Sequence, residues 1–289
     1  MPKDYCQISI DREHEAYLQY YFPEIKRGLF LPLAGTSLWE DDTLPKWEER
    51  PYDVVFTGNY TPLSKFEPTI ERHGKEYADF YYGIIEDFKK HPHLGMDIGI
   101  REHLLSEVED ITEDGVKEMM PNMIMIDLYV RNYFRGKVVQ TLVDAGVSVH
   151  CFGAGWEFLP CEHPENLIKE GGVDSLACLQ ALSKAKVSLN VMPWFKDGAH
   201  DRVFNSMLNG AVCFTDWSRY LTENLRDGED IFFYELDALE CLPDMVQGIL
   251  ENRKKWEHMQ KAAYETAEKS HTWEHRAGAV HKEILSKIR

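Results

Sequence analysis

The sequence lacks the features of a membrane or exported protein. It has no apolar run of membrane-spanning length, and its first residues, MPKDYCQISIDREHE, do not place a basic segment before an apolar one. Its six cysteines show no paired spacing, and most lie in apolar contexts such as VSVHCF and GAVCF. These absences argue against membrane insertion, export and a disulfide framework. We therefore expect a cytoplasmic protein with reduced cysteines.

Positive charge is also scarce. The chain has 32 Lys and Arg against 49 Asp and Glu, which gives a formal charge of -17. Nucleic acids and anionic membranes are bound through surplus Lys and Arg, so we expect neither as a partner. An anionic ligand would require a local cationic pocket. With 289 residues and an apolar share of 44%, the chain can bury the core of one large domain or two small ones.

Several catalytic and metal-binding motifs are missing as well. The sequence contains no Walker-type loop, no Ser-His-Asp order, no cysteine-rich metal spacing and no internal repeat. The run HTWEH places His271 and His275 four residues apart, which can chelate zinc on a helix, but no third ligand is evident. A packed, partly solvated helix face is the favoured interpretation, and we expect no metal. The acidic run Glu40 to Asp42 is interpreted as a solvated linker.

The first part of the chain predicts few elements. Residues 6–10 suit a strand, DREHEAYLQYYF a helix, and residues 29–33 a second strand, which is too little for a domain. The acidic, proline-containing run SLWEDDTLPKWEERP, residues 37–51, is typical of a linker. We therefore assign residues 1–50 to the end of a preceding unit with its linker, and residues 51–289 to one domain.

Residues 64–146 predict a helical insertion. Apolar side chains recur there at intervals of three, four or seven, as a helix with one buried face requires. We expect one helix containing residues 66–88, a second at residues 100–111 and a third at residues 121–145, ended by Gly146. They form a cap or insertion, since no linker follows them.

The remaining elements alternate between strand and helix. Buried-type strands are predicted at residues 52–57, 147–152, 187–192, 211–215 and 230–234. Helices are predicted at residues 174–185, 199–208 and 236–251, followed by two charged helices in residues 252–289. This order indicates the α/β class, with a Rossmann-like, doubly wound parallel sheet.

Two glycine-containing loops follow predicted strands. Gly58 and Asn59 begin the loop GNYTP, and FGAGW contributes Gly153, Gly155 and Trp156. FGAGW is not the dinucleotide fingerprint, because Phe158 stands where its third glycine would fall. Each loop is equally consistent with a tight turn and with a ligand contact.

The segment from Asp197 to Arg202 precedes the helix of a β-α-β unit, where a helix N-terminus can bind phosphate. His200 and Arg202 favour a phosphate contact there, although Asp201 satisfies the helix end without a ligand. Asp197 and Asn205, eight residues apart, could hold a sugar ring and a ribose. Their spacing alone favours a structural interpretation, in which Asp197 lies in a turn and Asn205 is a half-exposed residue of the helix.

The segment DGAHDRVFNSMLNGAVCFTD closely resembles the nucleotide-sugar-binding segment of CgeB-like glycosyltransferases, which belong to the two-domain GT-B group that includes the glycosyltransferases group 1. Further similarities are VFTGNYTP, FGAGWE, AKVSLNV and HTWEHRA, while DREHEAYLQYYFPEIKRGLFLPLAG is similar to the last elements of that family's N-terminal domain. The resemblance implies that the chain is the C-terminal, donor-binding half of a GT-B fold. It also implies that a missing N-terminal domain supplies the acceptor side and that the chain alone can lack turnover.

The resemblance also implies roles for individual residues. Asp197 and Asn205 stand where the wider group carries two Glu residues that contact the donor sugar and the ribose. Gly198 and His200 would face the diphosphate, and Arg202 would assist its departure. The two glycine-containing loops would flank the donor through Gly58, Asn59, Gly153, Gly155 and Trp156. Binding would need no metal and no cofactor, because the helix dipole and basic side chains replace a divalent ion.

Two functions are consistent with these observations. The leading hypothesis is a glycosyltransferase, or its donor-binding part, that transfers a sugar from a nucleoside diphosphate sugar to a carbohydrate or glycoconjugate acceptor. The alternative is a non-catalytic binding or scaffolding module on the same fold, motivated by Asn205 and by the missing acceptor domain. A nucleotide-sugar epimerase would instead require turnover without an acceptor.

Overall fold

The structure is a computed structural model that describes residues 5–39 and 43–288. The acidic run from Glu40 to Asp42, predicted to be a solvated linker, lies outside the described residues. Within the described part of the chain, no helix combines the length and the apolar character needed to span a bilayer.

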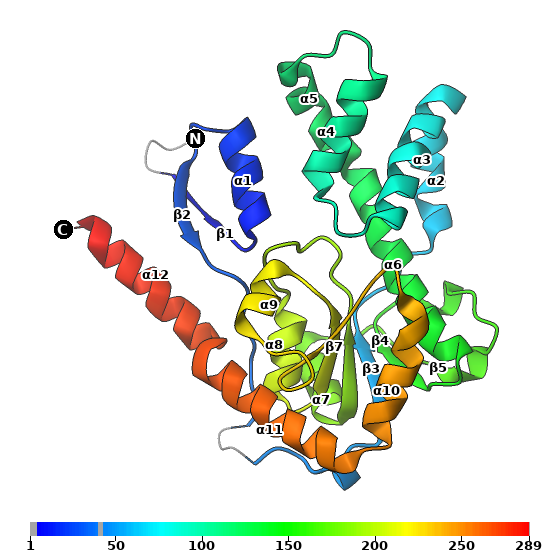
Figure 1. The fold of residues 1–289 in the computed structure, drawn as a ribbon, viewed down its shortest axis with the longest axis vertical. Coiled ribbons are helices and arrows are strands. Elements are labelled where there is room, and N and C mark those ends of the chain that lie inside the picture. The colour runs from blue at the N-terminus through cyan, green and yellow to red at the C-terminus, as the bar shows by residue number, and fades with distance from the viewer. Residues whose placement is uncertain (1–4, 40–42, 289) are drawn as a thin grey trace.

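A six-stranded parallel sheet forms the centre of the molecule (Figure 1). Its strands are β3 (Tyr52–Thr57), β4 (Val149–Phe152), β5 (Leu167–Gly171), β6 (Ala185–Asn190), β7 (Val212–Asp216) and β8 (Phe232–Tyr234). Their order is β5-β4-β3-β6-β7-β8, so the chain winds outwards in both directions from the pair β3 and β6. Val54, Val55 and Phe56 are completely buried, as expected for a strand covered on both faces. The predicted α/β, doubly wound fold class is confirmed.

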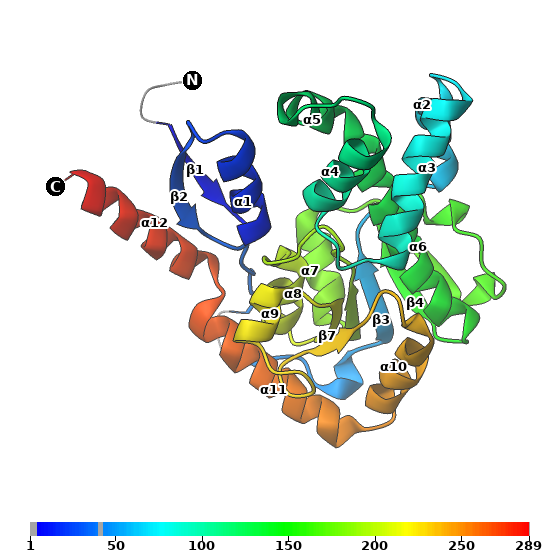
Figure 2. The ribbon, with the colours of Figure 1, turned by 45° about the horizontal axis from the view of Figure 1, so that its top comes forward.

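Helices cover both faces of this sheet. The relevant helices are α6 (Ile124–Asp144), α7 (Ser175–Ser183), α8 (Asp201–Leu208), α10 (Leu242–Leu250) and α11 (Arg253–Ser270). α7 and α8 contact each other and the strands on one face, with α11 outside α8, whereas α6 and α10 pack together on the other face (Figure 2). α8 buries Val203, Phe204 and Met207, which lie at helical spacing on one side of the helix.

The helical region between β3 and β4 contains more helices than predicted. They are α2 (Glu67–Glu71), α3 (Lys75–Lys90), α4 (Met96–Glu107), α5 (Glu113–Met119) and the first half of α6. The predicted second helix begins earlier, at Met96, because Gly95 provides an extended N-cap. α6 starts at Ile124 after a 3-10 turn, and its second half is the crossover helix that packs against β4.

The N-terminal residues form a separate small sheet. β1 (Cys6–Ser9) and β2 (Lys26–Phe30) pair in parallel, joined by α1 (Arg12–Tyr21). β2 ends three residues before the predicted strand does. The C-terminal helix α12 (Trp273–Ile288) runs beside them in both views (Figures 1 and 2). Arg276 of α12 donates to the carbonyl oxygens of Pro32 (2.7 Å) and Leu33 (3.2 Å), which joins the two ends of the described chain.

Three sequence predictions differ from the structure. β5 and α9 (Arg219–Asn224) were not predicted, since β5 is a short, mostly exposed edge strand with the sequence LIKEG. α10 begins at Leu242 rather than 236, after a 3-10 turn. HTWEH lies at the break between α11 and α12, so His271 and His275 do not share one helix face. His271 is buried and stacks on Phe204, with ring centroids 4.4 Å apart.

The predicted linker is partly built into the domain. Arg50 is 1% exposed and donates hydrogen bonds to the carbonyl oxygens of Ala185 (2.7 Å) and Asn209 (3.1 Å). Trp47 packs edge-on against Trp256. The end of the 37–51 segment therefore belongs to the core of the sheet domain.

Candidate donor-binding groove

A groove of about 350 Å³ opens beside the carboxyl ends of β3 and β4 and between α7 and α8. This is the side of the sheet where the chain changes direction between β3 and β6, which is where ligands bind in open parallel sheets. Six of the residues proposed from sequence line it: Gly58, Asn59, Gly153, His200, Arg202 and Asn205. The prediction did not include the opposite wall, formed by Val173, Ser175 and Cys178, or the entrance residues Thr36 and Trp273.

Two glycines form the floor of the groove. Gly153 has φ +154°, and a Cβ there would lie 2.2 Å from the carbonyl oxygen of Gly58. The loops after β3 and β4 therefore touch through their backbones, and a side chain at Gly153 would force them apart. Asn59 also connects the two loops, because its Oδ1 accepts a hydrogen bond of 2.9 Å from the Ala154 N–H.

Gly155 and Trp156 lie beneath this floor and do not line the groove. A Cβ at Gly155 would come 1.9 Å from the carbonyl oxygen of Tyr60, so this glycine serves a tight turn. Trp156 is 1% exposed, stacks on Tyr60, and donates from Nε1 to the Gly58 carbonyl at 2.8 Å. Both residues shape the Gly58 loop from inside the core, and neither presents its side chain to a ligand.

His200 begins α8 as its N-cap. Its Nδ1 accepts a hydrogen bond of 3.2 Å from the Arg202 N–H. Burial, followed by the nearby Arg202 charge, lowers the pKa of His200 to about 4. Nδ1 also lies 2.5 Å from Asp201 Oδ1, so this one ring nitrogen contacts both the start of α8 and the neighbouring carboxylate.

Arg202 reaches from α8 to the ends of the two central strands. Its Nε donates to Asn190 Oδ1 at 2.8 Å, and its Nη2 donates to the carbonyl oxygen of Val191 at 3.0 Å. Burial lowers the pKa of Arg202 below its ordinary value. Nη1 lies close above Gly58, since a Cβ on that glycine would be 3.4 Å from it.

Two further arginines that were not predicted come from α6 and lie beside Arg202. Neither lines the groove itself, and Arg131 lines a second cavity on the other side of Trp194. Arg135 donates from Nη1 to the carbonyl oxygen of Asn59 at 2.6 Å, and Arg131 forms an ion pair with Asp127. Burial, then the charges of Arg202 and Arg131, lower the pKa of Arg135 to about 9. The guanidinium group of Arg131 lies 4.2 Å from the ring centroid of Trp194, and that of Arg135 lies 5.6 Å from it.

These arginines form a cationic cluster with one ion pair among the described residues, that of Arg131 with Asp127. In the described part of the chain, Arg135 and Arg202 make no ion pair, and the buried Nε atoms of Arg131 and Arg135 have no hydrogen-bond partner. Like charges held together out of water are unfavourable unless an anion compensates them. The cluster is therefore suited to bind a phosphate or diphosphate through charge-assisted hydrogen bonds.

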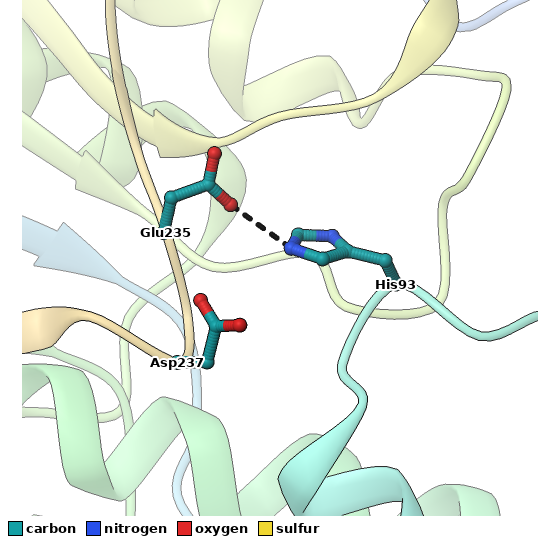
Figure 3. A group of neighbouring side chains, drawn as sticks. All are labelled: His93, Glu235 and Asp237. Carbon is teal, nitrogen blue, oxygen red and sulfur yellow. Dashed lines mark ion pairs between the residues drawn. The ribbon is translucent and has the colours of Figure 1, made fainter.

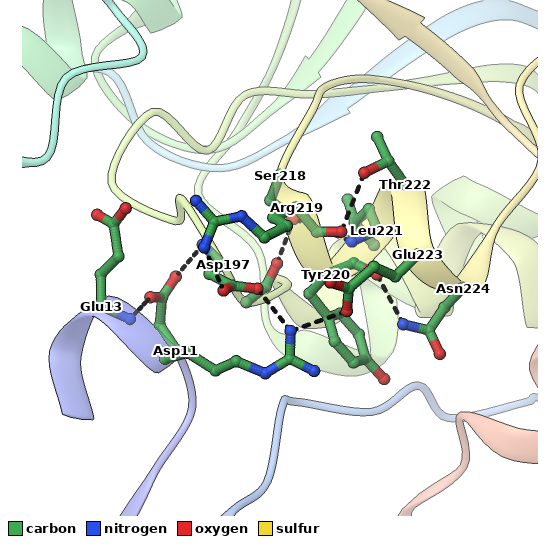
Figure 4. Close-up of polar contacts among 12 residues, drawn as sticks. Asp11, Glu13, Asp197, Ser218, Arg219, Tyr220, Leu221, Thr222, Glu223 and Asn224 are labelled. Carbon is green, nitrogen blue, oxygen red and sulfur yellow. Dashed lines mark hydrogen bonds and ion pairs between the residues drawn. The ribbon is translucent and has the colours of Figure 1, made fainter. Parts of the chain in front are cut away.

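Asp197 and Gly198 do not line the groove. Asp197 lies instead beside Asp11 of the N-terminal segment (Figure 4). The Asp197 side chain is 4% exposed, and its two carboxylate oxygens pair with Arg12 at 2.9 Å and Arg219 at 3.2 Å. Its backbone N–H donates to Asp11 Oδ2 at 3.0 Å. A Cβ at Gly198 would lie 2.4 Å from the carbonyl oxygen of Ile10. In this structure the pair fixes the segment before α8 to α1.

Asn205 lines the groove, but its amide already has partners. Its Oδ1 accepts a hydrogen bond of 2.8 Å from the Thr36 N–H, and its Nδ2 donates to Asp201 Oδ2 at 3.3 Å. Asn205 therefore joins the segment after β2 to α8 at the entrance of the groove.

A second cavity, of about 370 Å³, lies between α1, α4, α6 and the segment from Met192 to Lys196. Glu13 and Asp97 line it, and burial raises the pKa of both carboxyl groups. Trp194 lines this cavity and also contacts the ring of His200, at 5.9 Å between centroids, on the groove side. Carboxyl groups with raised pKa values in a cavity are candidates for proton transfer.

Comparison with known proteins identifies the family. The glycosyl transferase-like family matches residues 135–282, which contain α8, β7 and the FGAGW loop. This match covers more than half of the chain, and the chain belongs to that family. A comparison with the curated proteins finds no match.

Solved structures share the fold at low sequence identity. The structure of a mutant of S. aureus TarM in complex with fondaparinux, alpha-GlcNAc-glycerol and UDP aligns with a TM-score of 0.55 and 9% identity, covering 95% of this chain and 43% of that one. T4 phage BGT, in complex with its UDP-glucose substrate, aligns with a TM-score of 0.52 and 14% identity, covering 98% of this chain and 62% of that one. The GtfA/B complex aligns with a TM-score of 0.50 and 12% identity, covering 98% of this chain and 45% of that one.

These likenesses support the GT-B type of fold. The chain spans less than half the length of the TarM and GtfA/B chains, and less than two thirds of the T4 phage chain.

Proposed function

We propose that this chain binds a nucleoside diphosphate sugar in the groove and takes part in transferring the sugar to a carbohydrate or glycoconjugate acceptor. The cationic cluster of Arg131, Arg135 and Arg202 carries the proposal, because Arg135 and Arg202 make no ion pair within the described residues. Family membership and the UDP and UDP-glucose bound by similar structures support it.

In this proposal the diphosphate lies between Arg202 and Arg135, at the start of α8. The guanidinium groups and the helix dipole take the place of a divalent ion, so the groove requires no metal or cofactor. The ribose lies near Asn205, and the base extends towards Val173 and Ser175 on the opposite wall. Stabilising the negative charge of the departing diphosphate is the main catalytic contribution of these residues.

The acceptor enters from the second cavity. Glu13 and Asp97 are proposed to accept the proton that the acceptor hydroxyl loses, because both carboxyl groups line this cavity and burial raises their pKa values. Trp194 lines the second cavity and contacts the ring of His200, which lines the groove, so the transferred sugar would lie against Trp194. An Asp97→Asn variant should lower the rate of transfer without weakening nucleotide binding.

The role proposed for Asp197 requires a change in its partners. Its carboxylate can contact the donor sugar only after the ion pairs with Arg12 and Arg219 open. An Arg12→Ala variant should therefore bind the nucleotide sugar more tightly than the parent chain, while its affinity for the free nucleotide stays the same. Equal changes for both ligands would assign Asp197 a purely structural role.

The domain and subfamily assignments are part of the same proposal. We assign residues 51–289 to the donor-binding domain and residues 1–50 to a preceding domain and its linker, supported by the separate two-stranded sheet of β1 and β2. The end of this linker, at Trp47 and Arg50, packs into the donor-binding domain. The similarity of DGAHDRVFNSMLNGAVCFTD and HTWEHRA supports a CgeB-like subfamily.

The first experiment is thermal unfolding of the chain with UDP, GDP, ADP and their sugar conjugates. At a hundredfold excess over Kd, a bound ligand adds about 2.7 kcal/mol to the free energy of unfolding. Each kcal/mol should raise Tm by roughly 2–4 °C for a domain of this size. A rise of several degrees with one nucleotide is expected, and no rise with any of them would contradict the proposed groove.

Two observations are consistent with a second function, a binding or scaffolding module that has lost catalysis. Asn205 carries no charge, and the Asp197 carboxylate already pairs with two arginines. Incubation with a radiolabelled nucleotide sugar distinguishes the two functions. Release or transfer of the labelled sugar by this chain supports the enzyme and contradicts a module that has lost catalysis.

A further inference from the structure

Three side chains with metal-binding groups converge on the surface, and none of them lines the groove. His93, Glu235 and Asp237 each offer one ligand atom, and these atoms lie within 4.8 Å of one another. His93 Nε2 is 2.9 Å from Glu235 Oε2, and the Asp237 carboxylate faces the same space (Figure 3). The residues come from two distant segments: the α3–α4 loop and the loop that follows β8.

The α3–α4 loop is held in place independently of any metal. The Leu94 N–H donates to the carbonyl oxygen of His91 at 3.0 Å, which closes a tight turn around His93. Lys196 Nζ donates to the carbonyl oxygen of Pro92, so the loop is also fixed to the segment before α8. The imidazole therefore needs little reorganisation to bind an ion.

Trp217 orients the other side of the cluster. Its indole Nε1 donates to Glu235 Oε2 at 2.9 Å, and its ring stacks on the His93 ring with centroids 4.6 Å apart and an interplanar angle of 24°. Outer groups of this kind commonly fix the direction of metal ligands. One indole thus holds both the histidine and one of the carboxylates.

The cluster also lacks positive charge. Two carboxylates share one imidazole, and Asp237 forms no hydrogen bond or ion pair with any residue in the described ranges 5–39 and 43–288. A divalent ion would compensate the two carboxylates. One nitrogen and two oxygen ligands, with the remaining positions open to water, suit Zn²⁺ and its transition-metal neighbours better than Ca²⁺ or Mg²⁺.

We propose that His93, Glu235 and Asp237 bind a divalent transition-metal ion, with Zn²⁺ as the expected occupant. The ion joins the helical region to the loop after β8, which stabilises their contact at the carboxyl edge of the sheet. This site is separate from the nucleotide groove, and its test does not depend on the proposed transfer activity.

The test is calorimetric titration of the chelator-treated full chain with ZnCl₂ at pH 7.5, with thermal unfolding in parallel. We expect one site, and a rise in Tm of about 5 °C or more at a hundredfold excess of Zn²⁺ over Kd. His93→Ala should abolish both effects, and Asp237→Asn should weaken binding about tenfold or more. Asp237→Asn removes no contact of the folded chain, so it keeps the test valid if His93→Ala unfolds.

His91→Ala is the matched control. His91 lies in the same loop and is exposed, but it pairs with Asp87 and not with the cluster, so this variant should bind Zn²⁺ like the parent chain. Co²⁺ should quench the fluorescence of Trp217 in the parent chain and in His91→Ala, but not in His93→Ala. Equal Zn²⁺ affinity in all three variants, or a Kd above the millimolar range in the parent chain, would overturn the proposal. Unchanged nucleotide binding in Asp237→Asn would confirm that the two sites act separately.

Discussion

Replacing Arg135 with Met should separate binding from folding stability. Met keeps an unbranched apolar chain beside Trp194 but removes the charge and the hydrogen bond to Asn59. Hydrogen bonds to charged groups contribute about 1.5–3 kcal/mol, and each 1.4 kcal/mol changes Kd tenfold. The nucleotide that stabilises the parent chain most should therefore bind about 10-fold to 150-fold more weakly to Arg135→Met.

The same substitution should not destabilise the empty fold. A pKa lowered to about 9 means that holding the Arg135 charge is unfavourable, chiefly through burial and then through Arg202 and Arg131. Relief of this penalty should outweigh the loss of one hydrogen bond, worth about 1 kcal/mol. We expect a free energy of unfolding equal to that of the parent chain or up to about 2 kcal/mol higher, once solvent screening at this half-buried group is considered.

Calorimetric titration measures the Kd of the nucleotide, and urea unfolding without nucleotide measures the free energy of unfolding. Lys137→Met is the matched control, because Lys137 lies on the exposed side of the same helix and should change neither value. The reasoning fails if Arg135→Met binds the nucleotide within twofold of the parent chain. A loss of stability above about 2 kcal/mol would show instead that Arg135 is a structural residue.

Three further predictions concern the fold around the groove. Gly153→Ala should reduce the free energy of unfolding by about 2 kcal/mol or more and weaken nucleotide binding, because its Cβ would lie 2.2 Å from the Gly58 carbonyl oxygen. Urea unfolding measures the first effect and calorimetric titration with the nucleotide the second. The pKa of His271 is lowered by burial to about 4, so the unfolded state binds more protons between pH 6.5 and 4 and stability falls on acidification through that range. In His271→Gln the free energy of unfolding should decrease less between pH 6.5 and 4, as measured by urea unfolding at several pH values. A decrease equal to that of the parent chain would contradict the role given to His271. The pKa of Asp216 is raised by burial to about 7, so its folded state binds more protons between pH 3.8 and 7 and stability falls as pH rises through that window. Asp216→Asn, which can still accept from the Met192 N–H, should therefore stabilise the chain more at pH 8 than at pH 5, and an equal gain at both values would contradict this sign.

The sheet could be predicted because its strands carry strong local signals. Residues 52–57 contain the apolar run from Val54 to Phe56, and Gly58 follows them. The strand predicted at residues 187–192, which the structure has at Ala185–Asn190, carries Val187 and Leu189. β5 could not be predicted in the same way, since its residues Lys169 and Glu170 are exposed at the sheet edge. An edge strand with one covered residue resembles a loop in sequence.

The groove was predicted on one side only. The start of α8 and both glycine loops follow strands, so a parallel sheet brings them to one edge. Arg131 and Arg135 lie four residues apart on a long helix, a spacing that usually marks a solvated face and gives no sign of burial. Only the packing of α6 against β4 brings them close to Arg202 and the Asn59 loop.

The environment of Asp197 depends on contacts between distant segments. Arg12 is 185 residues away in sequence, and no local pattern joins the two. Their pairing follows from the docking of α1 onto the segment before α8. A role assigned from spacing alone therefore could not include the ion pairs that occupy this carboxylate.

The order of the strands has a consequence for how the domain folds. β3 lies at the centre of the sheet, where Val54 pairs with Val149 on one side and Val187 on the other. Both partners are synthesised after the whole helical region, so each pairing closes a long loop, whereas β6 with β7 and β4 with β5 close short ones. We expect the outer pairs to form early and the central strand to join them late. During that interval the apolar residues of β3 are exposed, and this strand is where misfolding and aggregation of the nascent chain should begin.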